Sequence, residues 1–268
     1  MSSLRFVNLL EIPFAWVAVR AARRVLGRYV ASQKRFRAQI ENKFGLEIGG
    51  PSSVFGDKGA LPLYRYVKGL DNCVFSQETI WEGRRGEGRT FSYHPRKTSG
   101  FNFIREGTDL RGIPDRSYEF VLSSHNLEHI SNPVRALKEW ERVTKPGGAI
   151  VVILPDYRHT FDHRRRPTPV AHMLEDYERS VDETDLSHVA EILELHDLTL
   201  DPAAGSREKF HERSLRNFEN RCLHHHVFDE LNSRELFAAA GLAIEVLELA
   251  KPHHIAILAR FPKIRASS

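Results

Sequence analysis

The chain has 268 residues and a net charge of only +4. With 41% hydrophobic and 28% charged residues, its composition is that of a soluble globular protein long enough for a sizeable core. Its two cysteines, Cys73 and Cys222, show neither metal-site spacing nor a disulfide framework. This excludes a disulfide-stapled secreted fold and predicts a reducing, cytoplasmic location.

Positive charge is concentrated at the start of the chain. Residues 1–43 carry nine Lys and Arg against two Glu, a charge of +7, so the remainder carries −3. The apolar stretch here is too short to span a bilayer and lacks a signal-peptide cleavage site. We expect a basic, amphipathic helical segment that packs on the domain or a partner chain, or makes peripheral contact with the inner face of a membrane. Because the body is not basic, we expect no nucleic-acid partner.

Strands and helices alternate through the first half of the chain. Residues 29–43 are predicted to be helical and to lead into a short apolar strand, Phe44–Ile48. Further strands are predicted at Tyr66–Leu70 and Phe101–Arg105. Residues 82–97, rich in Gly and Arg, are predicted to form a loop between them.

The middle of the chain carries sharper signals. A strand at Tyr118–Leu122 precedes a helix that Asn132 caps and Pro133 opens. The sequence KPGG, residues 145–148, ends this helix and turns the chain into a buried strand, Ala149–Leu154. Strands that alternate with helices in this way predict an α/β fold with a doubly wound, mostly parallel sheet.

The alternation is interrupted after the fifth strand. Helices are predicted near residues 170–181, 187–197 and 207–221, followed by a helix at Ser233–Ala240. Two final strands, Ala243–Leu249 and Ile255–Phe261, are close enough to pair as an antiparallel unit at the sheet edge. We therefore expect a helical insert after strand five and an antiparallel edge strand.

A glycine pair follows the first predicted strand, in the stretch LEIGGPSSVF, residues 46–55. Ligands of open α/β sheets bind beyond the carboxyl ends of the strands, where Gly49-Gly50 would let the backbone approach a cofactor. Pro51 and Ser53 stand where a nucleotide-binding loop has further glycines. Asp71, 24 positions after Glu47, is predicted to close the second strand, where a carboxylate holds a ribose diol.

Three further stretches carry a family resemblance: TDLRGIPDRSYEFVLSSHNLEHISNP, ALKEWERVTKPGG and AIVVILPD. With them, residues 107–156 resemble the class I S-adenosylmethionine (SAM)-dependent methyltransferases of the subgroup with an LEH signature. The resemblance, over about residues 44–156 and 229–261, implies a seven-stranded sheet. It also implies a methyltransferase domain at residues 44–261 with an acceptor-binding cap, 155–228, inserted in it, and a tail at 262–268.

The resemblance implies SAM as the cofactor and assigns its contacts. Glu47 and Gly49 match the acidic and first glycine positions of the cofactor loop, Asp71 the ribose carboxylate, and Asp109 with Leu110 the pair that flanks adenine. The full set of expected cofactor contacts is Glu47, Gly49, Gly50, Pro51, Ser52, Asp71, Asn72, Asp109, Leu110, Ser123, Ser124 and His125.

Methyl transfer from a sulfonium is an in-line displacement, and a hydroxyl acceptor requires a general base. His129 is the first candidate, with His125 and His225 next, since histidine suits this role near neutral pH. Glu128 could orient either His125 or His129. The alternative for His129 is a structural role at the helix entry.

The predicted insert holds nine of the chain's fourteen histidines. Such a polar lining suits a hydrogen-bonding acceptor, and sugar hydroxyls fit this description, as they do for many similar methyltransferases. The expected acceptor-binding residues are Asp156, Tyr157, His159, His163, Arg164, His224 and His226.

The stretch CLHHHVFDE, residues 222–230, raises the question of a divalent metal. Three consecutive side chains diverge, so they would not converge on one ion, although one or two could join Asp156, His159, Asp162 or His163. A metal is therefore not favoured, and its ligands stay unknown.

The leading prediction is O-methylation of a hydroxyl of a sugar or glycan, and other functions remain open beside it. A methyltransferase of a natural product or other small molecule is the nearest alternative. A non-catalytic SAM-binding domain is another, supported only by Pro51 and Ser53. A nicotinamide-dependent reductase would need the third glycine of the loop and has no use for the LEH and KPGG motifs. The sequence leaves the acceptor and the oligomeric state open.

Overall fold

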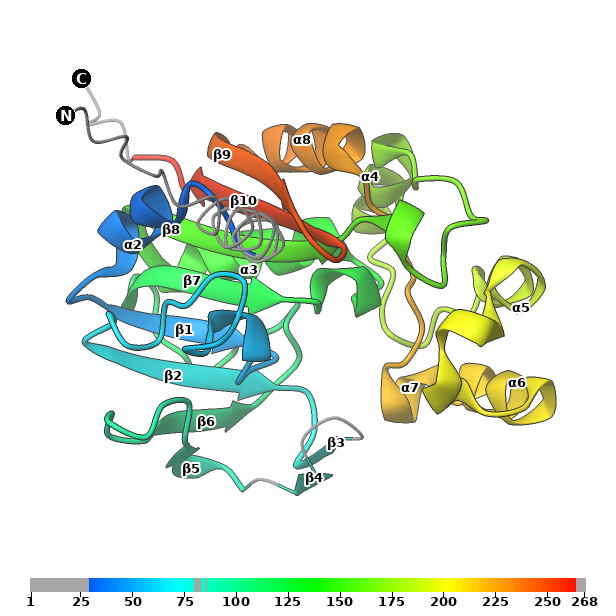
Figure 1. Ribbon diagram of the computed structural model, residues 1–268, viewed down its shortest axis with the longest axis horizontal. Coiled ribbons are helices and arrows are strands. Elements are labelled where there is room, and N and C mark those ends of the chain that lie inside the picture. The colour runs from blue at the N-terminus through cyan, green and yellow to red at the C-terminus, as the bar shows by residue number, and fades with distance from the viewer. Residues whose placement is uncertain (1–28, 80–82, 85, 264–268) are drawn as a thin grey trace, which may run out of the picture.

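The computed structural model describes residues 29–79, 83–84 and 86–263. Its centre is an eight-stranded sheet in the order β5-β6-β2-β1-β7-β8-β10-β9 (Figure 1). β6, β2, β1, β7 and β8 are parallel, while β5 is antiparallel to β6, and β10 is antiparallel to β8 and β9. The strands are β1 Phe44–Ile48, β2 Gly69–Val74, β5 Gly88–Phe91, β6 Gly100–Ile104, β7 Tyr118–Ser124, β8 Thr144–Pro155, β9 Ala243–Ala250 and β10 His254–Arg260, with a separate pair, β3 Glu78–Thr79 and β4 Gly83–Arg84.

The predicted doubly wound, mostly parallel α/β sheet is confirmed, with two corrections. The sheet has eight strands rather than seven, because β5 forms in the segment predicted to be a loop. Arg89 and Thr90 of β5 are exposed and only Phe91 is buried, so the strand has no alternation of apolar residues that the sequence could reveal. The second strand is Gly69–Val74, not Tyr66–Leu70, because Tyr64 and Val67 are buried in a turn that precedes it.

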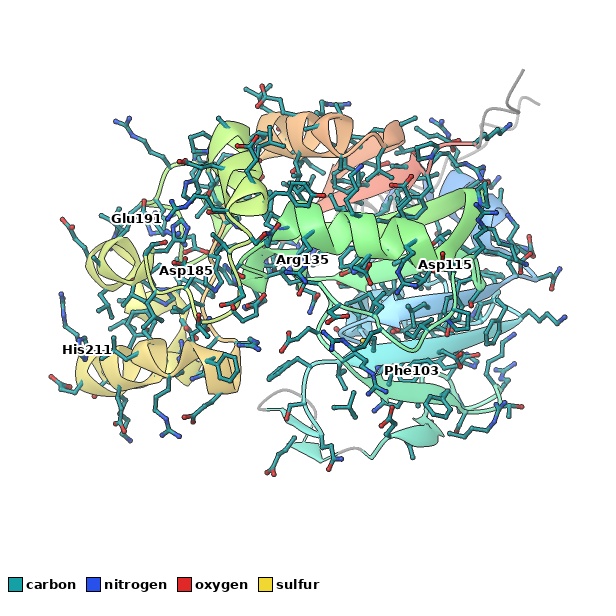
Figure 2. All side chains as sticks on the ribbon, turned by 180° about the vertical axis from the view of Figure 1, so that it is seen from behind. Phe103, Asp115, Arg135, Asp185, Glu191 and His211 are labelled. Carbon is teal, nitrogen blue, oxygen red and sulfur yellow. The ribbon has the colours of Figure 1, made fainter. Side chains whose placement is uncertain are left out.

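Helices cover both faces of the sheet. α3 lies across one face (Figure 2), where Leu137, Trp140 and Val143 enter the core, and α2 packs Phe36 and Ile40 on the other. As predicted, α3 starts after Asn132, whose side-chain oxygen accepts a hydrogen bond from the amide of Arg135 (3.0 Å). The helices are α2 Gln33–Ile40, α3 Pro133–Val143, α4 Val170–Glu178, α5 Val189–Leu195, α6 Arg207–Leu215, α7 Asn217–Asn220 and α8 Glu230–Ala239.

Helices α4 to α7 occupy the chain between β8 and α8, where the sequence predicts a helical insert. α5, α6 and α7 form a lobe beyond the arrowheads of β2 and β7 (Figure 1). This lobe has its own small core, which includes Val189, Ile192 and Phe210. The lobe therefore faces the carboxyl ends of the parallel strands, the edge at which α/β sheets bind ligands.

The amphipathic segment predicted at the start of the chain lies mostly outside the described residues, which begin at residue 29. Among the helices within the described ranges, none is long and apolar enough to cross a membrane.

Candidate active site

A cavity of about 720 Å³ lies where the carboxyl ends of β1, β2 and β7 meet the insert. Its volume is within the range of about 300–1,000 Å³ that small-molecule and cofactor sites have. The expected site residues that line it are Gly49, Pro51, Ser52, Ser124, His125, His129, His159 and His224.

Neither glycine of the loop after β1 can be replaced without a steric clash, because a Cβ atom at either position would collide with a neighbouring side chain. Gly49 has a φ of +76°, and a Cβ on it would lie 2.6 Å from Nδ2 of Asn126. A Cβ on Gly50 would lie 2.3 Å from the carboxyl carbon of Glu47. Ser52 then uses its hydroxyl to accept a hydrogen bond from the amide of Val54 (3.2 Å), which starts a short 3₁₀ helix. The loop is thus a shaped turn whose inner wall is backbone.

Buried side chains beneath the loop hold it in place. The carboxylate of Glu47 accepts hydrogen bonds from the hydroxyl of Tyr64 (2.8 Å) and the amide of Ser52 (3.1 Å). Asn72 accepts from the amide of Gly50 (2.9 Å) and donates to its carbonyl oxygen (3.1 Å). Glu47, Gly50 and Asn72, expected to contact the cofactor, lie behind the cavity wall and shape the loop.

Asp71 is not placed where the ribose role requires it. It is the third residue of β2, not the last, and accepts hydrogen bonds from the amide of Phe101 (2.7 Å) and the hydroxyl of Tyr118 (2.9 Å). The strand ends instead with Val74 and Phe75 in the cavity wall. The misplaced strand boundary in the sequence prediction is the reason for this correction.

The pair expected to flank adenine is also outside the cavity lining. Asp109 binds the guanidinium of its neighbour Arg111, and Leu110 is fully buried in the core. The chain after β6 instead contributes Arg105, Glu106 and Gly107 to the cavity wall. No local sequence pattern indicates that residues 105–107, rather than Asp109 and Leu110, line the cavity.

The end of β7 brings two serines and a histidine to the cavity edge. Ser123 is fully buried beneath it, whereas Ser124 lines it. Among the described residues, the hydroxyl of Ser124 has no hydrogen-bond partner. His125 places its Nε2 2.9 Å from Nδ1 of His254, and the next histidine, His253, also lines the cavity. The two histidines from the last hairpin were missed because the sequence prediction drew the site only from β1 to the insert.

Glu128 and His129 form the polar floor of the cavity. Glu128 is 1% exposed, and its Oε1 lies 3.6 Å from Nδ1 of His125, too far for a hydrogen bond; neither carboxylate oxygen has a hydrogen bond within the described part of the chain. Burial raises the pKa of Glu128, but His125 and His129 outweigh it, so the carboxyl titrates below its ordinary range. His129 donates Nδ1–H to the carbonyl oxygen of Leu223 (3.0 Å), and burial with the neighbouring His224 lowers its pKa to about 4.

A histidine–aspartate pair completes this floor. His224 donates Nδ1–H to Asp162 at 2.5 Å, and its ring packs edge-on against that of His129. Burial opposes the charged histidine, but Asp162 outweighs it and raises the pKa of His224. Arg165, 2% exposed, binds Asp162 (3.0 Å) and the carbonyl oxygen of His224 (2.8 Å). The tautomer this fixes leaves Nε2 of His224 as the nitrogen with a lone pair.

Adjacent histidines point elsewhere, as the sequence predicts for three consecutive side chains. His225 lies outside the cavity lining, where its Nε2 contacts the amide group of Asn217 (3.0 Å), and burial lowers its pKa to about 3. His226 is fully buried in a separate cluster. Neither is therefore placed to act as the base or to contact an acceptor in this cavity.

Four more residues expected to bind the acceptor lie outside the cavity lining: Asp156, Tyr157, His163 and Arg164. Asp156 caps the short helix Tyr157–His159 and binds Arg158 (2.8 Å). His163 and Arg164 both bind Asp197, at 2.9 and 2.8 Å. Of the residues expected in the insert, His159 and His224 reach the cavity, together with Thr160 and Phe161.

An ion-pair network closes the far side of the cavity. Arg221, 6% exposed, binds Glu106 at 2.5 Å, and its Nε lies 3.9 Å from Glu183. Glu183 accepts hydrogen bonds from the amide and hydroxyl of Ser131 (3.2 and 3.1 Å). Burial raises the pKa of Glu183 to about 7, since Arg221 offsets the desolvation only in part.

The cavity combines a glycine loop with polar and aromatic lining residues. A glycine loop follows the first strand, and its wall is backbone because a Cβ at Gly49 would collide with Asn126. The lining adds the hydroxyl of Ser124, which has no hydrogen-bond partner among the described residues, and the aromatic ring of Phe75. The strand order, with antiparallel β10 between β8 and β9, is that of the class I methyltransferase fold.

Comparison with known proteins gives the same class. Residues 92–152 match the family described as "Methyltransferase domain". The matched residues include β6, β7, α3 and most of β8, so this segment is similar to a methyltransferase domain. No curated protein matches the sequence.

Solved structures of SAM-dependent methyltransferases are similar to the chain over most of its length. One from Aquifex aeolicus shares 14% identity, covers 88% of this chain and 92% of its own, and has a TM-score of 0.42. One from Mesorhizobium loti shares 15% identity over 85% and 95%, with a TM-score of 0.46. A third, from Methanosarcina mazei, shares 17% identity over 88% and 99%, also with a TM-score of 0.46.

Proposed function

We propose that the protein transfers the methyl group of SAM to a hydroxyl of a sugar or glycan, with His224 as the general base. The observation that carries this proposal is the His224–Asp162 hydrogen bond of 2.5 Å at the wall of the cavity that the glycine loop also lines. An aspartate that receives Nδ1–H fixes the tautomer in which Nε2 accepts a proton. His224 replaces His129 as the first candidate because its Nδ1–H is bound by the carboxylate of Asp162, whereas Nδ1 of His129 binds the carbonyl oxygen of Leu223.

The cofactor side of the cavity is the β1 loop and the end of β2. Gly49, Ser52 and Ser124 would hold the methionine end of SAM, where backbone amides and hydroxyls meet its polar groups. Phe75 and Gly107 would hold the nucleoside end. When bound, SAM supplies an electrophilic methyl group on a sulfonium.

The acceptor side is the floor made by Glu128, His129 and His224, with His159 and Thr160 above it from the insert. The buried carboxylate of Glu128 has no hydrogen bond within the described residues, and such a group requires a donor. An acceptor hydroxyl supplies that donor. Glu128 would then orient the acceptor through this hydroxyl, and His224 would take the proton of a second, reacting hydroxyl of the acceptor as its oxygen attacks.

The polarity of this floor supports a sugar over an apolar acceptor. A sugar presents several hydroxyls in a fixed arrangement, and each can pair with a carboxylate or an imidazole nitrogen. A phenolic natural product is the second candidate, and the observation in its favour is that Phe75 and Phe161 also line the cavity.

Transfer of labelled methyl from SAM across a panel of saccharides, phenols and amines tests the proposal. We expect SAM and its demethylated product to bind by calorimetry, and methyl label to appear on a saccharide oxygen. Turnover of phenols alone would support the second candidate. Transfer to amines alone would contradict hydroxyl chemistry, and a chain that binds no SAM would contradict the cofactor assignment itself.

A further inference from the structure

A second histidine cluster lies apart from the cavity. His172 and Asp176 lie one helical turn apart on α4, His188 immediately precedes α5, and His226 comes from the segment before α8. One coordinating atom from each of the four residues lies within 4.8 Å of those of the other three. None of the four lines the 720 Å³ cavity. We propose that these residues bind a structural divalent transition metal ion, with zinc as the best match.

The spacing of the atoms fits tetrahedral coordination. Four ligands about 2.0–2.1 Å from a zinc ion at tetrahedral angles are separated by about 3.3–3.4 Å. Nε2 of His172 lies 3.1 Å from Nε2 of His188 and 3.4 Å from Oδ2 of Asp176. One coordinating atom of His226 lies within 4.8 Å of those of the other three residues. The distances from His172 to His188 and to Asp176 therefore lie within a few tenths of an ångström of this separation.

Protons alone cannot satisfy these contacts. Nε2 of His172 faces a nitrogen of His188 and an oxygen of Asp176, but it carries at most one hydrogen. If it donates to Asp176, it has no lone pair for His188; if it accepts from His188, Asp176 is left without a donor. A metal ion resolves this conflict because it takes a lone pair from each residue.

Buried polar atoms in the cluster point to a missing cation. Oδ2 of Asp176 has no hydrogen bond among the described residues, although the side chain is only 8% exposed. His226 is fully buried and donates Nε2–H to the carbonyl oxygen of Ser131 (3.1 Å), which leaves Nδ1 with a lone pair and no partner. A second ring nitrogen that binds a backbone carbonyl is the usual support for a metal-ligating histidine.

Three imidazoles and one carboxylate favour zinc over harder ions, since magnesium and calcium prefer oxygen ligands. Two other groups have ligands close together, but each is less complete. Glu128, His129 and His224 line the active cavity, with two of their nitrogens committed to Leu223 and Asp162. His125, His253 and His254 contain no carboxylate. The four-residue cluster would fasten α4 to the segment that carries His224 into the cavity.

Metal analysis and thermal unfolding of the full chain test the site with zinc as the probe. After dialysis against a chelator, we expect the chain to bind one zinc ion and its melting temperature to rise on addition of zinc. His188→Ala and Asp176→Asn should weaken binding by about 100-fold or more and remove the rise in melting temperature. Because His188 is only half-buried, its variant should fold even if a His226 variant does not.

His163→Ala is the matched control, since His163 is also a histidine of the insert that binds an aspartate. It should bind zinc as the unmodified chain does. Unchanged affinity in His188→Ala and Asp176→Asn would overturn the site. Loss of zinc binding in His224→Ala, with the cluster variants unaffected, would also overturn it and place the ion in the active cavity.

Discussion

The two sides of the active cavity satisfy their polar groups in different ways. On the sheet side, the polar side chains below the loop are paired within the protein: Glu47 with Tyr64 and Asn72 with Gly50. On the insert side, Glu128 is buried without a hydrogen bond among the described residues, and His224 keeps a lone pair at Nε2. The sheet side therefore offers a pre-shaped backbone, while the insert side offers reactive groups.

This difference predicts what mutations on each side should do. A change beneath the loop should alter its shape, and so affect stability and SAM affinity together. A change on the insert floor should leave SAM affinity unchanged and affect transfer. Measurements that report both quantities for each variant can therefore test the division directly.

The largest effect is expected on the insert side, from His224→Ala. Loss of the general base should lower the rate of transfer by about 10²–10⁴-fold while SAM affinity stays within about twofold, because the loop is intact. Single-turnover rates and calorimetry measure the two quantities. His163→Ala, which removes a histidine paired with an aspartate outside the cavity, should transfer at the normal rate.

Asp162→Asn checks the same role without a change in volume. It should also slow transfer, since the tautomer of His224 is no longer fixed. If His224→Ala retained the normal transfer rate, the base would be another group. The proposal that the insert side supplies the reactive groups would then be wrong.

On the sheet side, Gly50→Ala should have the next largest effect. Its Cβ would lie 2.3 Å from the carboxyl carbon of Glu47, which is held by Tyr64 and Ser52, so the loop has to move. We expect SAM affinity to fall by about tenfold or more and the melting temperature to fall with it. Gly86→Ala is the control, because nothing lies within 4 Å of a Cβ at that position.

The sheet side of the cavity could be predicted from the sequence better than the insert side. Signals within a few residues were reliable: Asn132 and Pro133 start α3, and Gly49 lies where a Cβ cannot fit. The order of strands and helices predicted the sheet because alternation fixes topology. The exposed strand β5 carried no such signal.

The chemistry on the insert side depends on contacts that no local pattern contains. Asp162 and His224 are 62 positions apart, and Arg165 joins them through the carboxylate of Asp162 and the carbonyl oxygen of His224. Likewise, Asp71 has the expected position in sequence, but the three-residue shift of β2 turns it toward Tyr118. Long-range packing decides both outcomes.

A smaller, pH-dependent effect is expected from Glu183→Gln at the far side of the cavity. Glu183 titrates near 7 instead of its usual 4.5, because burial and Glu106 outweigh Arg221. Between these values the folded chain holds more protons than the unfolded chain, so stability falls as pH rises through this window. Glutamine cannot ionise, so the variant should gain on the order of 2–3 kcal/mol relative to the unmodified chain between pH 4.5 and 8.

Denaturant unfolding of both proteins at several pH values measures this difference. Ser131 can still donate to the glutamine oxygen, so its hydrogen bonds do not confound the comparison. A stability difference that is constant across this pH range would mean that Glu183 stays ionised throughout and that Arg221 fully compensates its burial.

The smallest effect, and the sharpest test of the sheet side, comes from Asp71→Asn. Asp71 accepts from Tyr118 and from the amide of Phe101, so its loss of charge should cost about 1–2 kcal/mol of stability. Because it lies outside the cavity lining, SAM affinity should stay within about twofold. A tenfold loss of SAM affinity at unchanged stability would give Asp71 back the ribose role its sequence position suggests. In that case the cofactor would contact the carboxylate of Asp71, and the contact proposed for Phe75, which follows β2, would be wrong.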